Sequence, residues 1–174
     1  MAKKAETRTL AFEVGQSVVY PAHGVGRITA VEKQTVAGMQ LEVYVVAFDQ
    51  DKMILRVPTN RAEASGMRAL AGSKLVDDAL KTLGGKARIK RTMWSRRAQE
   101  YEAKINSGDL ISIAEVVRDL HRGDDQPEQS YSERQLYESA LDRMARELAA
   151  VENIDKGKAM EKLAKSLAKK KIAA

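Results

Sequence analysis

The residues most able to do chemistry in this chain lie in one short basic stretch around its single tryptophan, Trp94. Arginine side chains bind phosphates, and proteins that kink a duplex or hold it open through the minor groove combine such cations with a large apolar side chain placed between base steps. This pattern predicts contact with a polyanion, and with DNA in particular. The stretch spans residues 86–99 and contains no Asp or Glu; its cations are Lys86, Arg88, Lys90, Arg91, Arg96 and Arg97.

The element that must position Trp94 is a helix, expected over residues 92–106. Apolar side chains there recur at helical spacing, so a second interpretation is that Trp94 anchors a hydrophobic core. Trp94 nevertheless falls in the first turn, close to Gly84 and Gly85, and the N-terminus of a helix attracts phosphate groups. The residues alone leave both interpretations open. The apolar face comprises Trp94, Ala98, Tyr101 and Ile105.

Charge is unevenly distributed along the 174 residues, of which 44% are hydrophobic and 31% charged. Residues 1–64 hold 8 Lys and Arg against 7 Asp and Glu, whereas residues 65–174 hold 22 against 17, giving a net charge of +6 for the chain. A folded protein of one medium or two small domains is expected, with a polyanionic partner for the second half. For the lysines near the C-terminus, a solvated helix face explains the pattern equally well.

The first half has the alternating pattern of strands. Runs rich in Val, Ile and aromatic residues are separated by turn residues and end at prolines. Several short strands in about 50 residues predict a small bent barrel of the SH3 or Tudor type over residues 13–62, after a flexible N-terminus over residues 1–12. The expected strands span residues 14–20, 25–36, 41–48 and 53–58, with turns at 37–38 and 49–52.

The second half changes to the 3.6-residue period of helices. We expect a compact all-helical bundle over residues 67–172, with the domain boundary near 60–67. The fold class is therefore α+β, a small barrel followed by helices. The expected helices span 74–83, stopped by Gly84-Gly85; 92–106; one capped by Asp109 and ending near Gly123; one begun by a Ser132–Gln135 capping box; and one from Asp155.

The sequence contains no recognisable set of catalytic residues. It has no cysteine and two isolated histidines, His23 and His121, and it lacks the glycine-rich and nucleophile motifs of the common enzyme classes. We therefore expect no catalytic residues, no metal and no cofactor. No apolar run spans a bilayer and no signal peptide is apparent, so a cytoplasmic location is expected. The terminal Ala173-Ala174 resembles apolar tags read by bacterial unfoldase–proteases.

Taken together, several short segments resemble the CarD/CdnL family of bacterial RNA polymerase-binding transcription regulators. Each piece is weak alone, but their order and spacing are specific, and they extend over nearly the whole chain beyond its first ten residues. They are Val14-Gly15-Gln16-Ser17-Val18-Val19-Tyr20-Pro21 with His23-Gly24, Arg56-Val57-Pro58, Trp94-Ser95-Arg96-Arg97, Ser107-Gly108-Asp109, and Ala114-Glu115-Val116-Val117-Arg118-Asp119-Leu120.

The resemblance implies that the first half is a Tudor-like domain that docks on the lobe of the RNA polymerase β subunit, partly by pairing strands. The strand over residues 52–57 is then the expected docking edge, and Arg56 matches the family's polymerase-contacting arginine. Ile54 and Met53 lie on the same strand. Gln34 occupies the position where some members carry a second basic contact.

For the helical half, the resemblance implies a DNA-contacting domain. Trp94 matches a tryptophan that inserts in the minor groove at the upstream edge of the transcription bubble, and Arg96 matches an arginine that contacts the DNA backbone. Gln99 stands where some members carry another basic residue. We expect the remaining phosphate contacts to come from Arg97, Arg88, Lys90 and Arg91.

The function expected from the resemblance is that of a global regulator and activator, which stabilises the promoter open complex mostly without sequence specificity. The expected partners are RNA polymerase and promoter DNA, with no membrane, and the expected state is a monomer associated with the nucleoid through polymerase. The alternative is a free-standing basic nucleic-acid-binding protein that acts without polymerase. Tight binding to DNA in the absence of polymerase would favour that alternative.

Overall fold

The strands expected in the first half form one antiparallel sheet. The computed structural model describes residues 10–123 and 126–168. Neighbouring strands in the sheet follow the order β4-β3-β2-β1-β5, so β4 and the two-residue β5 are its edges. The strands are β1 (Ser17–Tyr20), β2 (Gly24–Val36), β3 (Met39–Phe48), β4 (Met53–Pro58) and β5 (Arg68–Ala69), of which β5 was not predicted.

The sheet curls because β2 bends over the barrel core. Its pairing with β3 shifts register between Ile28 and Ala30, and such an irregularity increases local twist. Gly26 lets β2 approach β3 closely, since a Cβ there would lie 2.7 Å from the Phe48 ring. Phe12 is also buried, with its ring edge-on to Tyr44. The buried core of the β-domain comprises Phe12, Val18, Ile28, Tyr44, Val46, Phe48, Val57, Ala62 and Met67.

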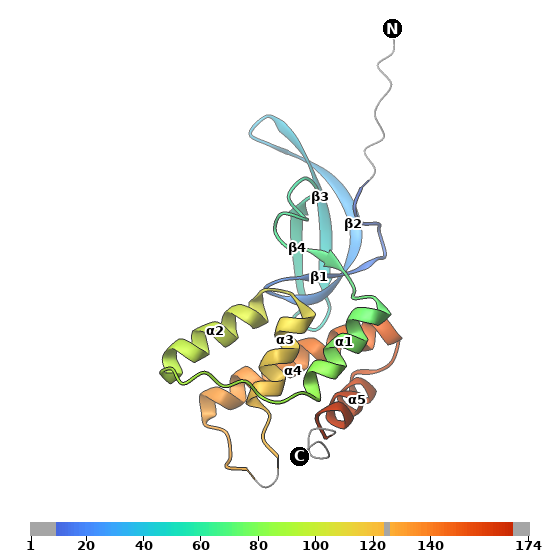
Figure 1. Cartoon of the computed structure of the whole chain (residues 1–174). Helices are drawn as coiled ribbons and strands as arrows, with labels where there is room; N and C mark the ends of the chain where they lie inside the picture. Colours follow the sequence, from blue (N-terminus) through green and yellow to red (C-terminus); the bar gives the residue numbers. More distant parts are fainter. Residues whose placement is uncertain (1–9, 124–125, 169–174) are drawn as a thin grey trace.

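The β2–β3 hairpin turns at Ala37-Gly38, as predicted. Both residues have positive φ, 51° and 77°, as a tight hairpin turn requires. The hairpin projects away from the helices (Figure 1), and the side chains beside the turn, Val36 and Met39, are exposed.

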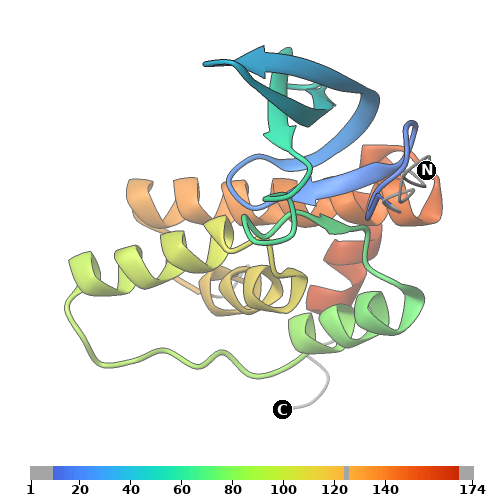
Figure 2. The same cartoon turned by 90° about the horizontal axis from the view of Figure 1, so that it is seen from above.

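Beneath the sheet, five helices make up residues 73–168 of the described chain, apart from the connecting segments. Figure 2 shows the β-domain lying over this helical layer. None of the described helices is long and apolar enough to cross a membrane. The helices are α1 (Ser73–Leu83), α2 (Trp94–Asn106), α3 (Leu110–Leu120), α4 (Tyr131–Glu152) and α5 (Lys156–Ala168).

The helical core contains part of the apolar face predicted for α2. Tyr101 and Ile105 of α2 are buried, whereas Trp94 packs at the edge of this core and is partly buried. Apolar residues of the other helices supply most of the rest of the core: Leu110, Ile113, Val117 and Leu120 of α3, Ala140, Met144 and Leu148 of α4, and Ala159, Leu163 and Leu167 of α5.

The helix ends are partly as expected. Asp109 caps α3, because its carboxylate accepts from the backbone N–H of Ser112 at 3.2 Å. The predicted Ser132–Gln135 capping box is wrong. Ser130 is the N-cap of α4 and accepts from the N–H of Glu133. Since Ser130-x-x-Glu133 has the same spacing two residues earlier, the helix includes Ser132 in its first turn.

Two further boundaries differ from the prediction. Helix α2 begins at Trp94 rather than at residue 92, with Met93 in the N-cap position. Helix α3 ends at Leu120 rather than near Gly123, since His121 already has an extended backbone. Helix α1 ends at Leu83 with Gly84 as its C-cap, as the glycine pair predicted.

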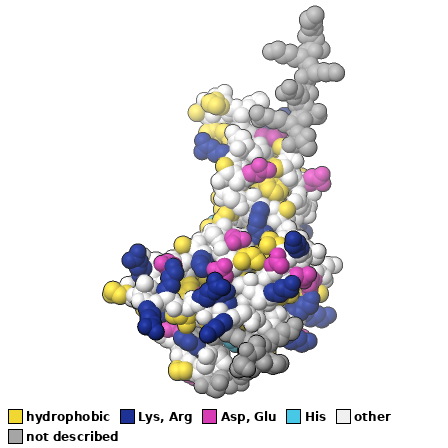
Figure 3. Space-filling model, viewed as in Figure 1, with side chains coloured by type: hydrophobic (Ala, Val, Ile, Leu, Met, Phe, Trp, Pro, Cys, Tyr) yellow, Lys and Arg dark blue, Asp and Glu magenta, His cyan; other side chains and the backbone are white. Residues whose placement is uncertain are grey.

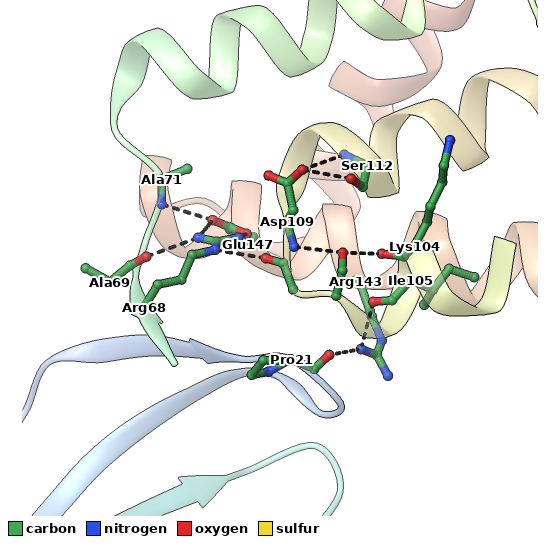
Figure 4. A network of polar contacts seen from close by, with 12 residues as sticks. Pro21, Arg68, Ala69, Ala71, Lys104, Ile105, Asp109, Ser112, Arg143 and Glu147 are labelled. Carbon is green, nitrogen blue, oxygen red and sulfur yellow. Dashed lines mark hydrogen bonds and ion pairs between the residues drawn. The ribbon is translucent and has the colours of Figure 1, made fainter. Parts of the chain in front are cut away.

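The two halves meet along α4 (Figure 4). The guanidinium of Arg143 donates to the backbone oxygens of Pro21 and Ala22, at 2.8 and 2.6 Å, in the turn between β1 and β2. Burial and then the neighbouring Arg146 lower the pKa of Arg143, whereas Asp142 and Asp51 raise it.

One turn further along α4, Glu147 is buried and accepts two hydrogen bonds from Arg68 of β5, at 2.8 and 2.6 Å. The N–H of Ala71 donates to the same carboxylate at 2.9 Å. Nearby, Pro21 packs between Gly66 and Gly108, where an added Cβ would lie 2.8 and 3.1 Å from its atoms. We call these contacts the domain joint: Pro21, Ala22, Gly66, Arg68, Ala71, Gly108, Arg143 and Glu147.

The predicted fold class is confirmed: a small curled antiparallel sheet followed by a helical region. The N-terminal residues 1–9 and the terminal Ala173-Ala174 lie outside the described residues.

The reassigned cap of α4 predicts different effects for two serines. Ser130→Ala should lower the free energy of unfolding by about 1 kcal/mol, because the N–H of Glu133 loses its acceptor. Ser132→Ala, at the cap expected from the sequence, removes no capping bond and loses only the exposed hydrogen bond donated by the Trp94 indole N–H, so its loss should be smaller, about 0.5 kcal/mol. Denaturant unfolding followed by circular dichroism measures both. Equal losses in the two variants would contradict the assignment.

Candidate nucleic-acid interface

An extended arm of chain leads from α1 to the start of α2 and carries four of the six cations of the basic stretch, Lys86, Arg88, Lys90 and Arg91. It is tied to the bundle at Arg88, whose backbone N–H donates to the Asp119 carboxylate at 2.9 Å. Asp119 is buried and also accepts from the guanidinium of Arg118 at 2.9 Å. The backbone of the arm is thus anchored to α3, while the side chain of Arg88 remains exposed.

Trp94 is the first residue of α2 and is only partly buried. Its ring lies against Tyr101, with 6.3 Å between centroids and 48° between planes. Its indole N–H donates to the hydroxyl of Ser132 in the first turn of α4, at 3.1 Å. The indole is therefore held in a defined orientation at the surface. The sequence left open whether Trp94 anchors the core or is available to contact DNA. The ring packs on the core and also reaches solvent, so neither interpretation alone describes it.

Arg97 lies next to the indole. The carbon of its guanidinium is 5.4 Å from the ring centroid of Trp94 and 5.8 Å from that of Tyr101. One of its nitrogens donates to the Tyr101 hydroxyl at 3.4 Å. A cation over an aromatic face contributes about 0.5–1 kcal/mol at an exposed site. Arg97 thus braces the tryptophan in addition to adding positive charge.

The start of α2 favours negative charge. No side chain caps it and no acidic residue lies in its first turn. The N–H groups of Arg96 and Arg97 are satisfied by the Met93 oxygen at 3.1 Å, so the N–H groups left without an intrahelical acceptor are those of Trp94 and Ser95. An uncapped N-terminus presents N–H groups and the positive end of the helix dipole. Met93 is 78% exposed beside Trp94. An anion at this position would therefore meet backbone donors as well as the exposed side chain of Arg96.

The other predicted cations surround this helix start. Arg91 and Lys90 precede it directly and are exposed, and Lys90 lies 3.5 Å from Glu100 in an exposed ion pair. Figure 3 shows Lys and Arg side chains gathered on the part of the surface that covers α2 and the arm before it. The structure thus brings together Trp94, Arg96, Arg97, Lys90 and Arg91, whereas Arg88 lies further back, toward α3.

The start of α4 adds residues that sequence reasoning missed. Ser132 contacts the indole, and Tyr131 is 78% exposed beside it. The sequence predicts Ser132 as a helix cap, and nothing local in it indicates a contact with Trp94, 38 positions away. Later on the same helix, burial raises the pKa of Tyr137, whose hydroxyl lies 3.0 Å from Nδ1 of His121.

The second predicted site is the edge strand β4. The side chains of Ile54 and Arg56 are exposed, whereas Met53 is partly buried against the barrel core, so the alternation along the strand is as predicted. Arg56 lies 3.8 Å from Glu32 of β2 in an exposed ion pair. Gln34 lies on β2 opposite Leu41, two strands away from β4 and toward the hairpin turn. It therefore does not adjoin β4 within the sheet.

Within the described residues, no group of three or more His, Cys, Asp or Glu is placed to hold a metal ion. The features that the structure does place together are a surface indole, an uncapped helix start and exposed cations.

Comparison with known proteins identifies both halves. Residues 12–71 match the model of the CarD-like/TRCF RID domain, and residues 78–164 match the model of the CarD C-terminal domain. The chain belongs to the CarD family. Its members are transcription regulators, and the CarD resemblance of the sequence is thereby confirmed.

Two individual proteins are similar to this CarD-like chain. A Bacillus subtilis protein named "Putative transcription factor YdeB" is 26% identical over 143 residues, which cover 82% of this chain and 94% of that protein. The solution structure of the 72-residue N-terminal domain of Myxococcus xanthus CarD is 34% identical, with a TM-score of 0.31; the match covers 35% of this chain and 81% of that domain.

The bracing role of Arg97 can be tested through the intrinsic fluorescence of Trp94, the chain's single tryptophan. Arg97→Ala should increase quenching by acrylamide and lower the free energy of unfolding by about 0.5–1 kcal/mol, because the guanidinium no longer covers the ring. The neighbouring Arg96→Ala is the matched control and should change neither measurement. The bracing role is wrong if both variants respond alike.

Proposed function

We propose that this CarD-like protein docks on the β-subunit lobe of RNA polymerase and stabilises the promoter open complex by placing Trp94 at the upstream edge of the bubble. The observation that carries this proposal is the partly buried indole held at the uncapped start of α2 among arginines. The comparisons support the family, and the placement on polymerase and DNA is what membership in that family suggests.

The geometry of Trp94 suits an apolar wedge in the minor groove. Tyr101, Arg97 and Ser132 hold the ring, and part of it remains exposed to solvent. Unstacking a base step costs a few kcal/mol, and an apolar side chain that fills the step offsets part of this cost. Since the ring is already ordered, little side-chain entropy is lost when it inserts.

The cations around the wedge suit contacts to the DNA backbone. Arg96, Arg91, Arg88 and Lys90 are exposed, and the helix start adds backbone N–H donors. Contacts to phosphate position a protein without reading base identity. Binding at the bubble is then specified by where polymerase has melted the duplex rather than by a DNA sequence.

The edge strand β4 suits docking by strand addition. It pairs with β3 on one side, so its other side leaves backbone donors and acceptors for a strand of the partner. The exposed Ile54 and Arg56 flank this edge. Docking raises the concentration of Trp94 near one DNA position, so a helical domain with weak affinity for free duplex can act at a promoter.

Stabilisation follows from differential affinity. A protein that binds the open complex more tightly than the closed one shifts the equilibrium by that difference alone. A difference of about 1.4 kcal/mol changes the ratio of open to closed complexes tenfold. The proposed partners are thus RNA polymerase and promoter DNA, with the protein on the nucleoid through polymerase.

Trp94→Ala tests the wedge. The variant should still bind the β lobe, because Trp94 lies in the helical half, and it should lose most of the lengthening of open-complex lifetime. Trp94→Phe keeps an apolar ring and should retain part of it. Lifetimes are measured with purified polymerase and promoter DNA after addition of a competitor. A full effect from Trp94→Ala would overturn the wedge, and tight binding of wild-type protein to free duplex would favour action without polymerase.

Arg56→Glu tests the docking edge. It reverses a charge at the edge and places a carboxylate beside Glu32, so binding to the β lobe should weaken by about tenfold or more. Lys33→Glu makes the same change of charge at an exposed position of β2 and should bind normally. Binding of purified lobe is measured by calorimetry or pull-down. Normal binding by Arg56→Glu would contradict the proposed edge.

A further inference from the structure

Two charged side chains one turn apart on α4 hold the β-domain at two points. Arg143 binds the β1–β2 turn through the oxygens of Pro21 and Ala22. Glu147 binds β5 and the chain that follows it, through Arg68 and the N–H of Ala71. Because one attachment alone would leave the β-domain free to pivot about it, the pair restricts rotation as well as separation (Figure 4).

The same contacts include the corner between α2 and α3. Arg143 also donates to the backbone oxygen of Ile105 at 3.3 Å, and Arg68 donates to that of Gly108 at 2.8 Å. The domain joint therefore contacts the C-terminal end of α2. Trp94 is at the opposite end of this helix, and β4 is at the opposite edge of the sheet from β5.

This arrangement makes α2 a lever. Its 13 residues span about 20 Å, so a rotation of about 10° at the joint displaces Trp94 by roughly 3.5 Å, about the rise of one base pair. A small loss of rigidity at the joint is enough to move the indole from one base step to the next.

We propose that Arg143 and Glu147 are positioning residues, which fix the orientation of Trp94 relative to the β4 edge. This inference rests on the proposed function. Neither residue needs to contact DNA or polymerase. Each half keeps its own binding surface when Arg143 or Glu147 is replaced. The two residues orient these surfaces so that both can bind one polymerase–promoter complex at the same time.

The test uses the full chain with Arg143→Ala, which removes the contacts to the β1–β2 turn, and Arg143→Lys, which can restore one of them. Arg146→Ala is the matched control, because Arg146 is an arginine of the same helix that pairs with Asp142 at 2.9 Å. Since the chain has no cysteine, spin labels can be placed at Thr35→Cys on β2 and Glu102→Cys on α2, both exposed positions.

Three kinds of measurement, namely affinity, label distance and open-complex lifetime, separate positioning from binding. For Arg143→Ala, affinities for the isolated lobe and for free duplex should stay within about twofold of wild type, because the site is distant from both surfaces. The distribution of label distances should broaden, and the lengthening of open-complex lifetime should fall on the order of tenfold. Arg143→Lys should be intermediate, and Arg146→Ala should match wild type in all three.

The possible results are distinct. A broadened distribution with an unchanged lifetime would overturn the positioning role and leave the proposed function intact. An unchanged distribution in Arg143→Ala would overturn the joint itself. If Arg143→Ala does not fold, Arg143→Lys is compared with wild type instead. The proposal is overturned if this variant has the same distribution of label distances and the same open-complex lifetime as wild type. If wild-type protein does not lengthen the lifetime, the proposed function is wrong whatever the distances.

Discussion

The buried carboxylate of Glu147 is the constraint on which the arrangement of the molecule depends. A buried charged group is tolerated only where partners replace the water it has lost, and here those partners come from across the domain joint. Arg68 supplies two hydrogen bonds and Ala71 a third. Separating the β-domain from the helices would leave this carboxylate without hydrogen-bond partners. The free energy needed to break these bonds therefore keeps the two halves together.

From this junction the two candidate surfaces extend in opposite directions. The sheet leads from β5 across β1, β2 and β3 to the exposed edge of β4, and α2 leads from its C-terminal end at the domain joint to the partly exposed Trp94. Each surface shows polar or aromatic groups held by neighbours rather than free in solvent. The indole has Tyr101, Arg97 and Ser132, and Arg56 has Glu32.

Local patterns in the sequence predicted most elements, because buried side chains recur every second residue in a strand and about every 3.6 residues in a helix. The alternation of Met53, Leu55 and Val57 with Ile54 and Arg56 is found in β4, and Tyr101 and Ile105 face the helical core. The contacts that could not be predicted are those between residues far apart in the sequence. The spacing S-x-x-E/Q occurs twice within a few residues, and nothing local shows that Ser132 faces an indole 38 positions away. Arg143 likewise contacts Pro21 across 122 positions. The basic cluster around Trp94 could be predicted, since it is contiguous, whereas the bracing role of Arg97 required the helix and Tyr101 together.

The contact of Pro21 with Gly66 and Gly108 has a consequence for how the protein responds to ionic strength. This packing involves no charge, and the Glu147 carboxylate beside it is buried, so dissolved ions screen the joint little. Contacts between exposed cations and phosphates are, in contrast, strongly weakened by salt. Rising salt should therefore weaken the proposed contacts with DNA, while the relative orientation of the two halves persists and remains suited to binding when the salt concentration falls.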